Sequence, residues 1–190
     1  TQIDQLHIIP PSVATQPLLP MADLLPYLQQ KHAEWQQAYA HVYHNSDQDD
    51  FVSFEGEAEN GQLIVGIIDS TLLAWPHKPS HPWMLTLHIA YDGNGLNGMP
   101  SKQAYQHMEA FEDAVMAELP EHEGYLNLGR ATGDGVRLVY IACKQFVQAT
   151  RVLERLMPRF AQDMSIEYDL FQDKYWQSLQ RFEHMGTEAD

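Results

Sequence analysis

The sequence predicts an α+β fold built on an antiparallel sheet, and three observations support this class. Apolar and polar residues alternate in several short stretches, apolar residues recur at helical spacing in longer ones, and glycine-containing turns join neighbouring strand-like segments. The 190 residues are 44% apolar, which is enough for a sizeable core. We expect a Pro-rich arm and a helix over residues 1–48, followed by a single α+β domain over residues 49–190.

The segment before the domain combines prolines with one helical pattern. Prolines are frequent within residues 1–20 and no apolar period is present, which indicates an extended arm. After Asp23, which we expect to cap the helix, apolar residues follow at helical spacing. They are Leu24, Leu28, Trp35, Tyr39 and Val42.

A β-hairpin is predicted around Asn60-Gly61, the dipeptide that a two-residue type I′ turn requires. With this turn, one face of the hairpin carries Glu55, Glu57 and Glu59. The opposite face carries Phe54, Ala58, Leu63, Val65 and Ile67. An apolar face opposite an acidic one is typical of a half-buried antiparallel pair.

The segments from residue 83 to residue 170 follow a β-α-β-β-α-β order. Helices are expected at 101–119 and 145–157, between strands at 83–91, 125–132, 136–143 and 164–170. This is the order of the split βαβ, or ferredoxin-like, fold. We therefore expect a ferredoxin-like core at 83–170 whose antiparallel sheet is extended by the N-terminal β-hairpin, with flanking N- and C-terminal helices.

Residues 93–98 match the G-x-G-x-x-G spacing of a dinucleotide-binding loop, but the surrounding sequence does not fit that site. Pro100 follows the third glycine, so the helix begins beyond it. The next strand ends with Arg130 and Thr132 instead of an acidic residue for a ribose. We interpret the glycines as a flexible loop and expect no cofactor.

Arg130 and Arg137 are expected on one face of the second hairpin, close together near its tip. Like charges in opposed positions are unfavourable unless an anionic group lies between them. Asp134 or a neighbouring carboxylate is one candidate for this group. A bound anion, or the acidic side chain of a partner, is the other.

A second candidate surface is the sheet face opposite the predicted helices. His88 lies on the polar side of its strand, so it should lie on this face, with Tyr125 and Tyr140 nearby. Asn127 and Leu138 should join them. If helices cover one face only, this open face exposes aromatic groups among polar ones, as binding surfaces do.

Charge and cysteine content limit the possible functions. With 26 acidic against 11 basic residues the formal charge is −15, which disfavours nucleic acid and anionic membrane surfaces as partners. The lone Cys143 fits a reducing cytoplasm. Prolines surround His77 and His81 and prevent them from sharing a metal on one helix. We expect no metal site and no catalytic residue.

Several stretches resemble a known family. They are FEGEAENGQLIVGIID, HPWMLTLHIAYDGNGLNGMPSKQAYQHMEAFEDAV, GRATGDGVRLVYIAC and DKYWQSL. Together they resemble the bacterial domain-of-unknown-function family 695, over residues 50–182. That family has no established activity, so the resemblance implies a cytoplasmic bacterial protein and no catalytic residue. In some relatives the domain is joined to one resembling the regulator of ribonuclease activity B, a small acidic protein that inhibits a ribonuclease by binding it.

We expect a non-catalytic interaction or regulatory module whose partner is another protein or a second copy of this chain. The candidate binding residues are Arg130, Arg137, His88, Tyr125 and Tyr140. The alternative is an enzyme or a binder of an anionic small molecule. In that case the arginine pair would hold the anion, and His88 or a carboxylate would carry protons.

Overall fold

The computed structural model describes residues 10–15, 18–161 and 164–182 of the chain. Its contacts divide the chain into two units, one ending at Val42 and one beginning at Tyr43. The domain boundary expected between residues 48 and 49 stays a prediction. Residues 1–9 and Pro17 of the expected arm lie outside the described residues.

The first unit contains one long helix, α1 (Met21–Tyr39), after a short 3-10 turn, η1 (Pro11–Val13). The helix begins earlier than expected. Pro20 occupies the N-cap position, and Asp23 lies in the first turn, where its charge complements the helix dipole. Among the described residues, no helix is both long and apolar enough to cross a bilayer.

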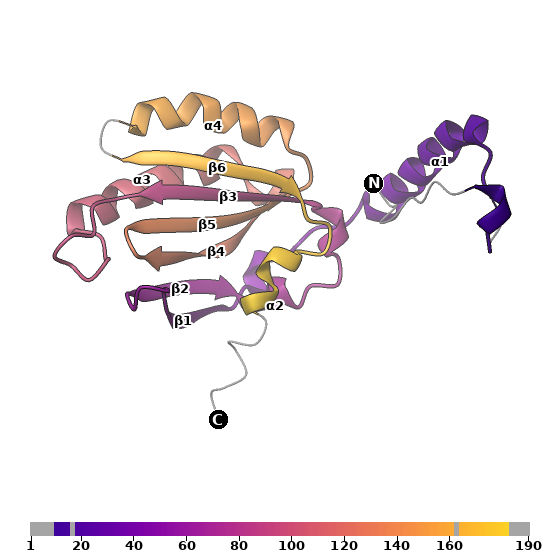
Figure 1. Ribbon diagram of the computed structural model, residues 1–190. Helices are drawn as coiled ribbons and strands as arrows, with labels where there is room; N and C mark the ends of the chain where they lie inside the picture. The colour runs from indigo at the N-terminus through magenta and orange to yellow at the C-terminus, as the bar shows by residue number, and fades with distance from the viewer. Residues whose placement is uncertain (1–9, 16–17, 162–163, 183–190) are drawn as a thin grey trace. The chain divides into compact units, whose positions relative to one another are not determined.

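The second unit is α+β, with a six-stranded sheet whose neighbouring strands are all antiparallel (Figure 1). The strands lie in the order β1-β2-β4-β5-β3-β6. Their bounds are β1 (Phe51–Glu57), β2 (Leu63–Asp69), β3 (Trp83–Ala90), β4 (Tyr125–Gly133), β5 (Val136–Cys143) and β6 (Ser165–Gln172). The helical segments are η2 (Ser46–Gln48), α2 (Ser70–Leu73), η3 (Lys78–Ser80), α3 (Lys102–Glu118), η4 (Glu121–Glu123), α4 (Val147–Phe160) and η5 (Gln177–Phe182).

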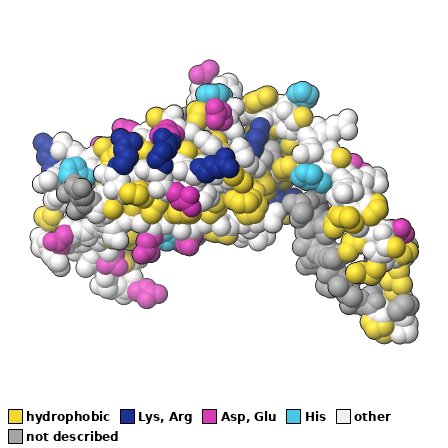
Figure 2. Space-filling model, turned by 90° about the horizontal axis from the view of Figure 1, so that it is seen from above, with side chains coloured by type: hydrophobic (Ala, Val, Ile, Leu, Met, Phe, Trp, Pro, Cys, Tyr) yellow, Lys and Arg dark blue, Asp and Glu magenta, His cyan; other side chains and the backbone are white. Residues whose placement is uncertain are grey.

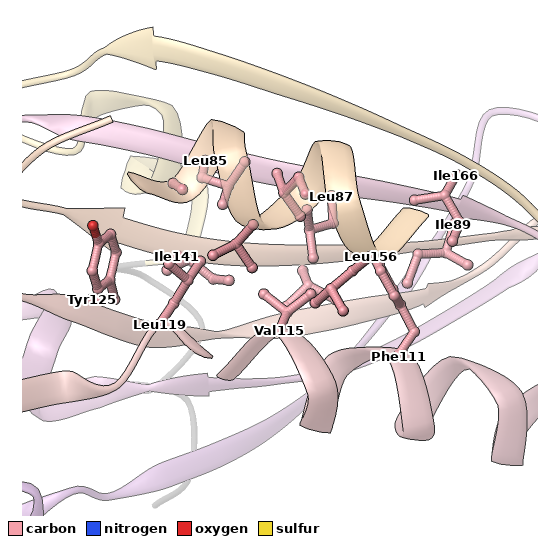
Figure 3. Close-up of a cluster of buried hydrophobic side chains, with 14 of the residues drawn as sticks. Leu85, Leu87, Ile89, Phe111, Val115, Leu119, Tyr125, Ile141, Leu156 and Ile166 are labelled. Carbon is pink, nitrogen blue, oxygen red and sulfur yellow. The ribbon is translucent and has the colours of Figure 1, made fainter. Parts of the chain in front are cut away.

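Helices α3 and α4 pack on one face of the sheet, which we call the helical face. Phe111 and Val115 of α3 meet Leu156 of α4 over the apolar side of β3 and β5, in a cluster whose members are almost fully buried (Figure 3). The side-chain hydroxyl of Ser101 caps α3 by accepting the amide N–H of Ala104 at 3.1 Å. This core fixes α3 against the sheet.

The opposite face is also covered over much of its area, which corrects the expectation of an open face. Short helix α2 and the C-terminal segment that includes η5 pack on it. Trp176 is fully buried there, and its indole N–H donates to the carbonyl of His81 at 2.9 Å. The ring of Phe182 lies against those of Phe54 and Tyr140, at 5.1 and 5.6 Å between centroids. Tyr140 is therefore a core residue.

The turn between β1 and β2 differs from the expected type I′ turn. Within Asn60-Gly61, only Gly61 has a positive φ, of 82°. The amide of Ala58 donates to the carbonyl of Gln62 at 2.9 Å. These features describe a longer loop closed by a left-handed glycine, the second common hairpin connection.

This turn shifts the register of the hairpin by one residue. Glu57 lies opposite Leu63, and Glu55 opposite Val65. Because side chains alternate along a strand, a shift of one residue moves every side chain of β2 to the other face. Leu63, Val65 and Ile67 therefore share a face with Glu55 and Glu57, and our expectation that they oppose the acidic face is wrong.

A bulge in β4 corrects the expected position of Tyr125. The strand register shifts between Asn127 and Gly129, and Gly129 has a φ of 133°. The extra residue inverts the alternation, so Tyr125 points to the helical face before the bulge and Arg130 points there after it. Tyr125 is 1% exposed in the core beneath the helices and does not lie near His88 on the other face.

The second hairpin turns at Asp134-Gly135, where both residues have positive φ values of 51° and 75°. The glycine loop, residues 93–98, folds as successive turns, as expected. Its last carbonyl, that of Gly98, accepts the amide N–H of Gly135 at 3.0 Å. Because α3 begins only at Lys102, beyond the loop, the glycines do not form the phosphate-binding start of a helix.

Candidate functional site

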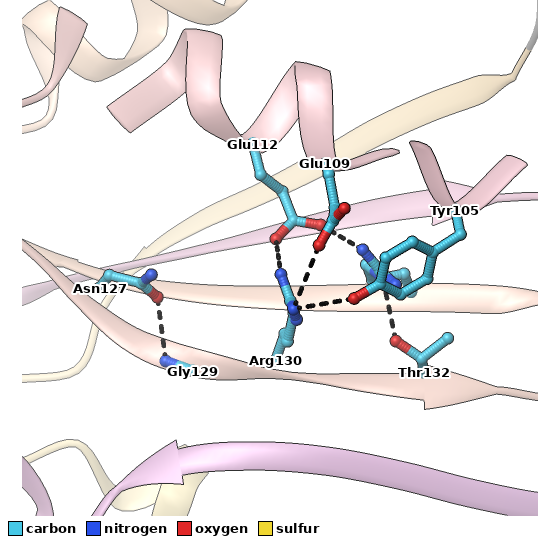
Figure 4. Close-up of polar contacts among 8 residues, drawn as sticks. Tyr105, Glu109, Glu112, Asn127, Gly129, Arg130 and Thr132 are labelled. Carbon is cyan, nitrogen blue, oxygen red and sulfur yellow. Dashed lines mark hydrogen bonds and ion pairs between the residues drawn. The ribbon is translucent and has the colours of Figure 1, made fainter. Parts of the chain in front are cut away.

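Arg130 and Arg137 lie close together on the helical face, as expected. Between their guanidinium groups lies the carboxylate of Glu112 from α3 (Figure 4). One oxygen accepts from Arg130 at 2.9 Å, and the other accepts from Arg137 at 2.8 Å. The anionic group between the arginines is therefore a neighbouring carboxylate.

Other side chains complete the coordination of Arg137, which is 1% exposed. Its Nε donates to the hydroxyl of Thr132 at 2.9 Å, and its guanidinium carbon lies 4.6 Å from the ring centroid of Tyr105. Arg130 is the more accessible arginine and contacts the Tyr105 hydroxyl at 3.3 Å. We call these four residues, with Glu112, the arginine network.

The arginine network is electrostatically balanced within the fold. Glu109 adds a second carboxylate, 3.7 Å from Arg130. Two guanidinium groups thus face two carboxylates, and the buried one of each kind makes short, charge-assisted hydrogen bonds. Removal of either partner from such a buried ion pair destabilises the fold, because the remaining charge is left without compensation.

The remaining predicted site residues do not join this network. His88 lies on the opposite face, where its Nε2 is 3.2 Å from a carboxylate oxygen of Asp169. The hydroxyl of Tyr140 accepts from Arg181 at 2.7 Å, and burial raises its pKa. Burial also raises the pKa of Tyr125 to about 12. The five residues are therefore divided among the arginine network, the core beneath the helices, which holds Tyr125, and the opposite face, which holds His88 and Tyr140. Their roles in binding stay predictions.

A partly exposed apolar surface adjoins the arginine network. It consists of Phe51, Leu63, Val65 and Ile67 on the helical side of β1 and β2, and we call it the hairpin face. Ile67 lies directly opposite Arg130 in the sheet, which makes the two features continuous. Neither of the two buried clusters of the described residues includes these four side chains.

Sheet and helix dimensions explain why the hairpin face is uncovered. Six strands, each about 4.8 Å wide, form a sheet about 29 Å across, whereas two helices of about 10 Å diameter cover about 20 Å and leave about 9 Å. The two helices cover β3, β5 and their neighbours. The hairpin of β1 and β2 lies at the side of the sheet away from α4 (Figure 1). Room for another helix therefore remains beside α3.

Charged side chains surround this surface unequally. Glu55 and Glu57 are exposed and project from the same side of β1 as Phe51. The view onto the α4 side shows basic side chains in a row (Figure 2), and α4 carries exposed arginines at every fourth position. They are Arg151, Arg155 and Arg159. Acidic side chains thus border the hairpin face, whereas the row of arginines lies on α4.

A hollow of about 200 Å³ lies beside the glycine loop, between Tyr91, Asp92 and the first two turns of α3. Ligand pockets usually measure about 300–1,000 Å³, so this hollow is small for a dinucleotide. His107 and Met164 complete its lining. The hollow supports no specific ligand.

Two groupings were missed by sequence reasoning. Glu112 is not among the predicted site residues, although it follows Met108 by four residues and so borders the buried stripe of α3. The structure also brings together His44, Asp49 and Asp69, whose ligand atoms all lie within 4.8 Å of one another. Within the described part of the chain, these three residues form the one group of at least three such side chains that could hold a metal ion.

Comparison with known proteins gives one match. No curated protein and no solved structure matches the chain. The model of a protein family, described as a family of unknown function (DUF695), matches residues 57–182. This match includes Leu63, Val65 and Ile67 of the hairpin face, the arginine network and η5, and it begins after Phe51. The chain therefore belongs to DUF695, a family of unknown function.

Proposed function

We propose that this chain is a non-catalytic interaction module that holds an amphipathic, cationic helix of a partner protein on the hairpin face. The observation that carries the proposal is the uncovered apolar surface on β1 and β2 beside α3. Apolar surface rimmed by polar groups is typical of protein interaction sites. A helix placed there would continue the layer that α3 and α4 form over the sheet.

Charge supports a cationic occupant. Glu55 and Glu57 border the hairpin face on one side, and Glu109 of α3 borders the arginine network on the other. The chain as a whole carries a formal charge of −15. A basic segment would be steered toward this surface and would place its apolar side on Val65 and Ile67.

We further propose that β3 to β6, with α3 and α4, form a ferredoxin-like core. The order β4-β5-β3-β6 and the placement of both helices on one face support this assignment. In this view β1 and β2 are an addition at the β4 edge, and the uncovered surface arises from that addition. We also propose a cytoplasmic location, as expected from the sequence.

A peptide titration tests the proposed function. The probe is a fluorescent 18-residue helix with leucines at positions i, i+3, i+4 and i+7 and lysines on its other side. Fluorescence anisotropy at 150 mM salt should show saturable binding. A peptide with glutamates in place of the lysines, and a scrambled peptide of equal positive charge, should bind at least tenfold more weakly. Equal binding of the scrambled peptide would contradict the proposal.

Two matched variants locate the binding surface. Phe51 and Phe171 are both 41% exposed and lie on the two edge strands, β1 and β6, but on opposite faces of the sheet. Phe51→Thr should weaken peptide binding by about tenfold, and Phe171→Thr should leave it unchanged. Val65→Thr is a second change on the hairpin face and should act like Phe51→Thr.

The alternative function, a binder of an anionic small molecule, has one supporting observation. The side chain of Arg130 is 27% exposed, so part of it is accessible to a solute. Phosphate or an organic acid would then raise Tm, and Arg130→Gln would abolish that rise. A pairing of two copies through the hairpin face is a third outcome, and light scattering of the wild type and of Val65→Thr distinguishes it from monomeric binding.

A further inference from the structure

The group His44, Asp49 and Asp69 lies where the chain enters β1 and leaves β2. Asp69 ends β2 and pairs with Phe51 at the start of β1, which brings it next to the segment before β1. That segment holds the other two residues, and Nε2 of His44 contacts a carboxylate oxygen of Asp49. The pairing of the two strands therefore brings Asp69 to the two potential metal ligands that precede β1.

Asp69 provides the second observation. It is 0% exposed, and its Oδ1 caps α2 by accepting from the amide and hydroxyl of Thr71, at 2.9 and 2.7 Å, and from the amide of Leu72. Its Oδ2 has no hydrogen-bond partner among the described residues. A buried carboxylate oxygen without a hydrogen-bond partner is costly, so this atom indicates a missing cationic or hydrogen-bonding group.

The neighbouring groups are arranged as a ligand set requires. Asp49 places a second carboxylate near the buried one, and two like charges so close are unfavourable without a cation between them. The ring of Trp75 meets that of His44 edge-on at 5.7 Å and so restricts its orientation. His44 and Asp69 are almost inaccessible, whereas the Asp49 side chain is 21% exposed and leaves a path from solvent.

We propose that His44, Asp49 and Asp69 bind a divalent transition-metal ion of the zinc class. One imidazole and two carboxylates suit Zn²⁺ and similar ions, whereas Mg²⁺ and Ca²⁺ favour oxygen ligands alone. Tetrahedral zinc holds its ligand atoms about 3.4 Å apart, and these three ligand atoms lie within 4.8 Å of one another, so small shifts of the side chains would give binding geometry. Three protein ligands leave one position for water.

The bound ion would connect β2, through its last residue, to the segment that leads into β1. It would also complete the coordination of Asp69 without disturbing the α2 cap, because the cap uses the other carboxylate oxygen. This proposal does not depend on peptide binding. Failure of one leaves the other intact.

Isothermal titration of the full chain, after removal of metals by a chelator, tests the site. Zn²⁺ should bind with a stoichiometry of one and a Kd in the micromolar range or below, and at 100-fold excess over Kd it should raise Tm by about 5–10 °C. Mg²⁺ should do neither. Asp49→Asn and His44→Gln should each weaken Zn²⁺ binding by at least thirtyfold.

His77→Gln is the matched control, since His77 also contacts the ring of Trp75 at 5.6 Å but lies outside the ligand group. It should bind Zn²⁺ like the wild type. Co²⁺ gives a second readout: visible absorption typical of tetrahedral coordination should appear in the wild type and be lost in Asp49→Asn, which retains the buried cap residue. Unchanged Zn²⁺ affinity in both ligand variants, or no rise of Tm in the wild type, would overturn the proposal.

Discussion

Replacement of Glu112 by glutamine is the most direct test of the arginine network. The substitution retains the size of the side chain and removes its charge. It leaves the guanidinium of Arg137, which is 1% exposed, without its carboxylate, and it turns an amide N–H₂ group toward one of the two arginines. The folded chain would then contain a buried cation with no compensating anion.

The magnitude follows from the two contacts. Removal of one partner from a buried ion pair costs about 3–5 kcal/mol, and the contact with the more exposed Arg130 adds less than about 1 kcal/mol. The retained amide oxygen still accepts one hydrogen bond, so we expect a loss of about 3 kcal/mol in the free energy of unfolding. For a domain of this size the loss corresponds to a decrease of about 6–12 °C in Tm.

Urea denaturation followed by tryptophan fluorescence measures this change, and Glu109→Gln is its control. Glu109 projects from the same helix toward Arg130, but it is 41% exposed and 3.7 Å away. Its replacement should change stability by less than about 0.5 kcal/mol. If both variants lose similar amounts, or if Glu112→Gln loses less than 1 kcal/mol, the description of Glu112 as the anion of a buried network is wrong.

Three further predictions concern the rest of the fold. Burial, with the positive charges of Lys144 and His44, lowers the pKa of His81 from 6.5 to about 3, so the unfolded chain binds this proton before the folded chain does. His81 should therefore cost no stability above pH 6.5 and about 1.4 kcal/mol per pH unit as the pH falls from 6.5 toward 3. In urea denaturation at a series of pH values, the free energy of unfolding of His81→Gln should decrease less steeply with falling pH than that of the wild type. Gly129→Ala should destabilise by about 2–4 kcal/mol in the same assay, because a Cβ would lie 2.2 Å from the carbonyl oxygen of Ile67 at a φ of 133°, and an unchanged midpoint would contradict the bulge. Phe182→Ala should cost about 3 kcal/mol and accelerate tryptic cleavage at Arg181, whereas unchanged cleavage would show that this segment does not cover the sheet.

Local patterns were sufficient to predict the three long helices α1, α3 and α4, the six strands and their order along the chain. The stripe Met108, Phe111 and Val115 identified α3, and alternation identified β3 and β5. The α+β class follows from that order. The position of η5 could not be predicted in this way, because Trp176 and Leu179 indicate an apolar segment but not the distant surface against which it packs.

Two single-residue effects decided which side chains form the surface. Asn60-Gly61 is compatible with two hairpin connections whose registers differ by one residue, and the sequence does not distinguish them. The choice determines whether Val65 is buried or forms the hairpin face. Gly129 in the middle of a strand was the available signal for the bulge that places Tyr125 in the core.

The side-chain groups depend on contacts between distant segments. Glu112 reaches Arg130 and Arg137 only after α3 packs on the sheet. His44 and Asp69 meet only because β1 pairs with β2, and no ligand spacing in the sequence marks them. Such groups are visible in a structure and not in a motif.

The central claim is that a cationic amphipathic helix binds on the hairpin face. Mapping of amide chemical-shift changes, in isotope-labelled chain titrated with the leucine–lysine peptide, tests it most directly. We predict that the largest changes occur at Phe51, Leu63, Val65 and Ile67 and in the adjoining turns of α3. Changes centred on β6, or spread evenly over the acidic surface, would contradict the proposed function.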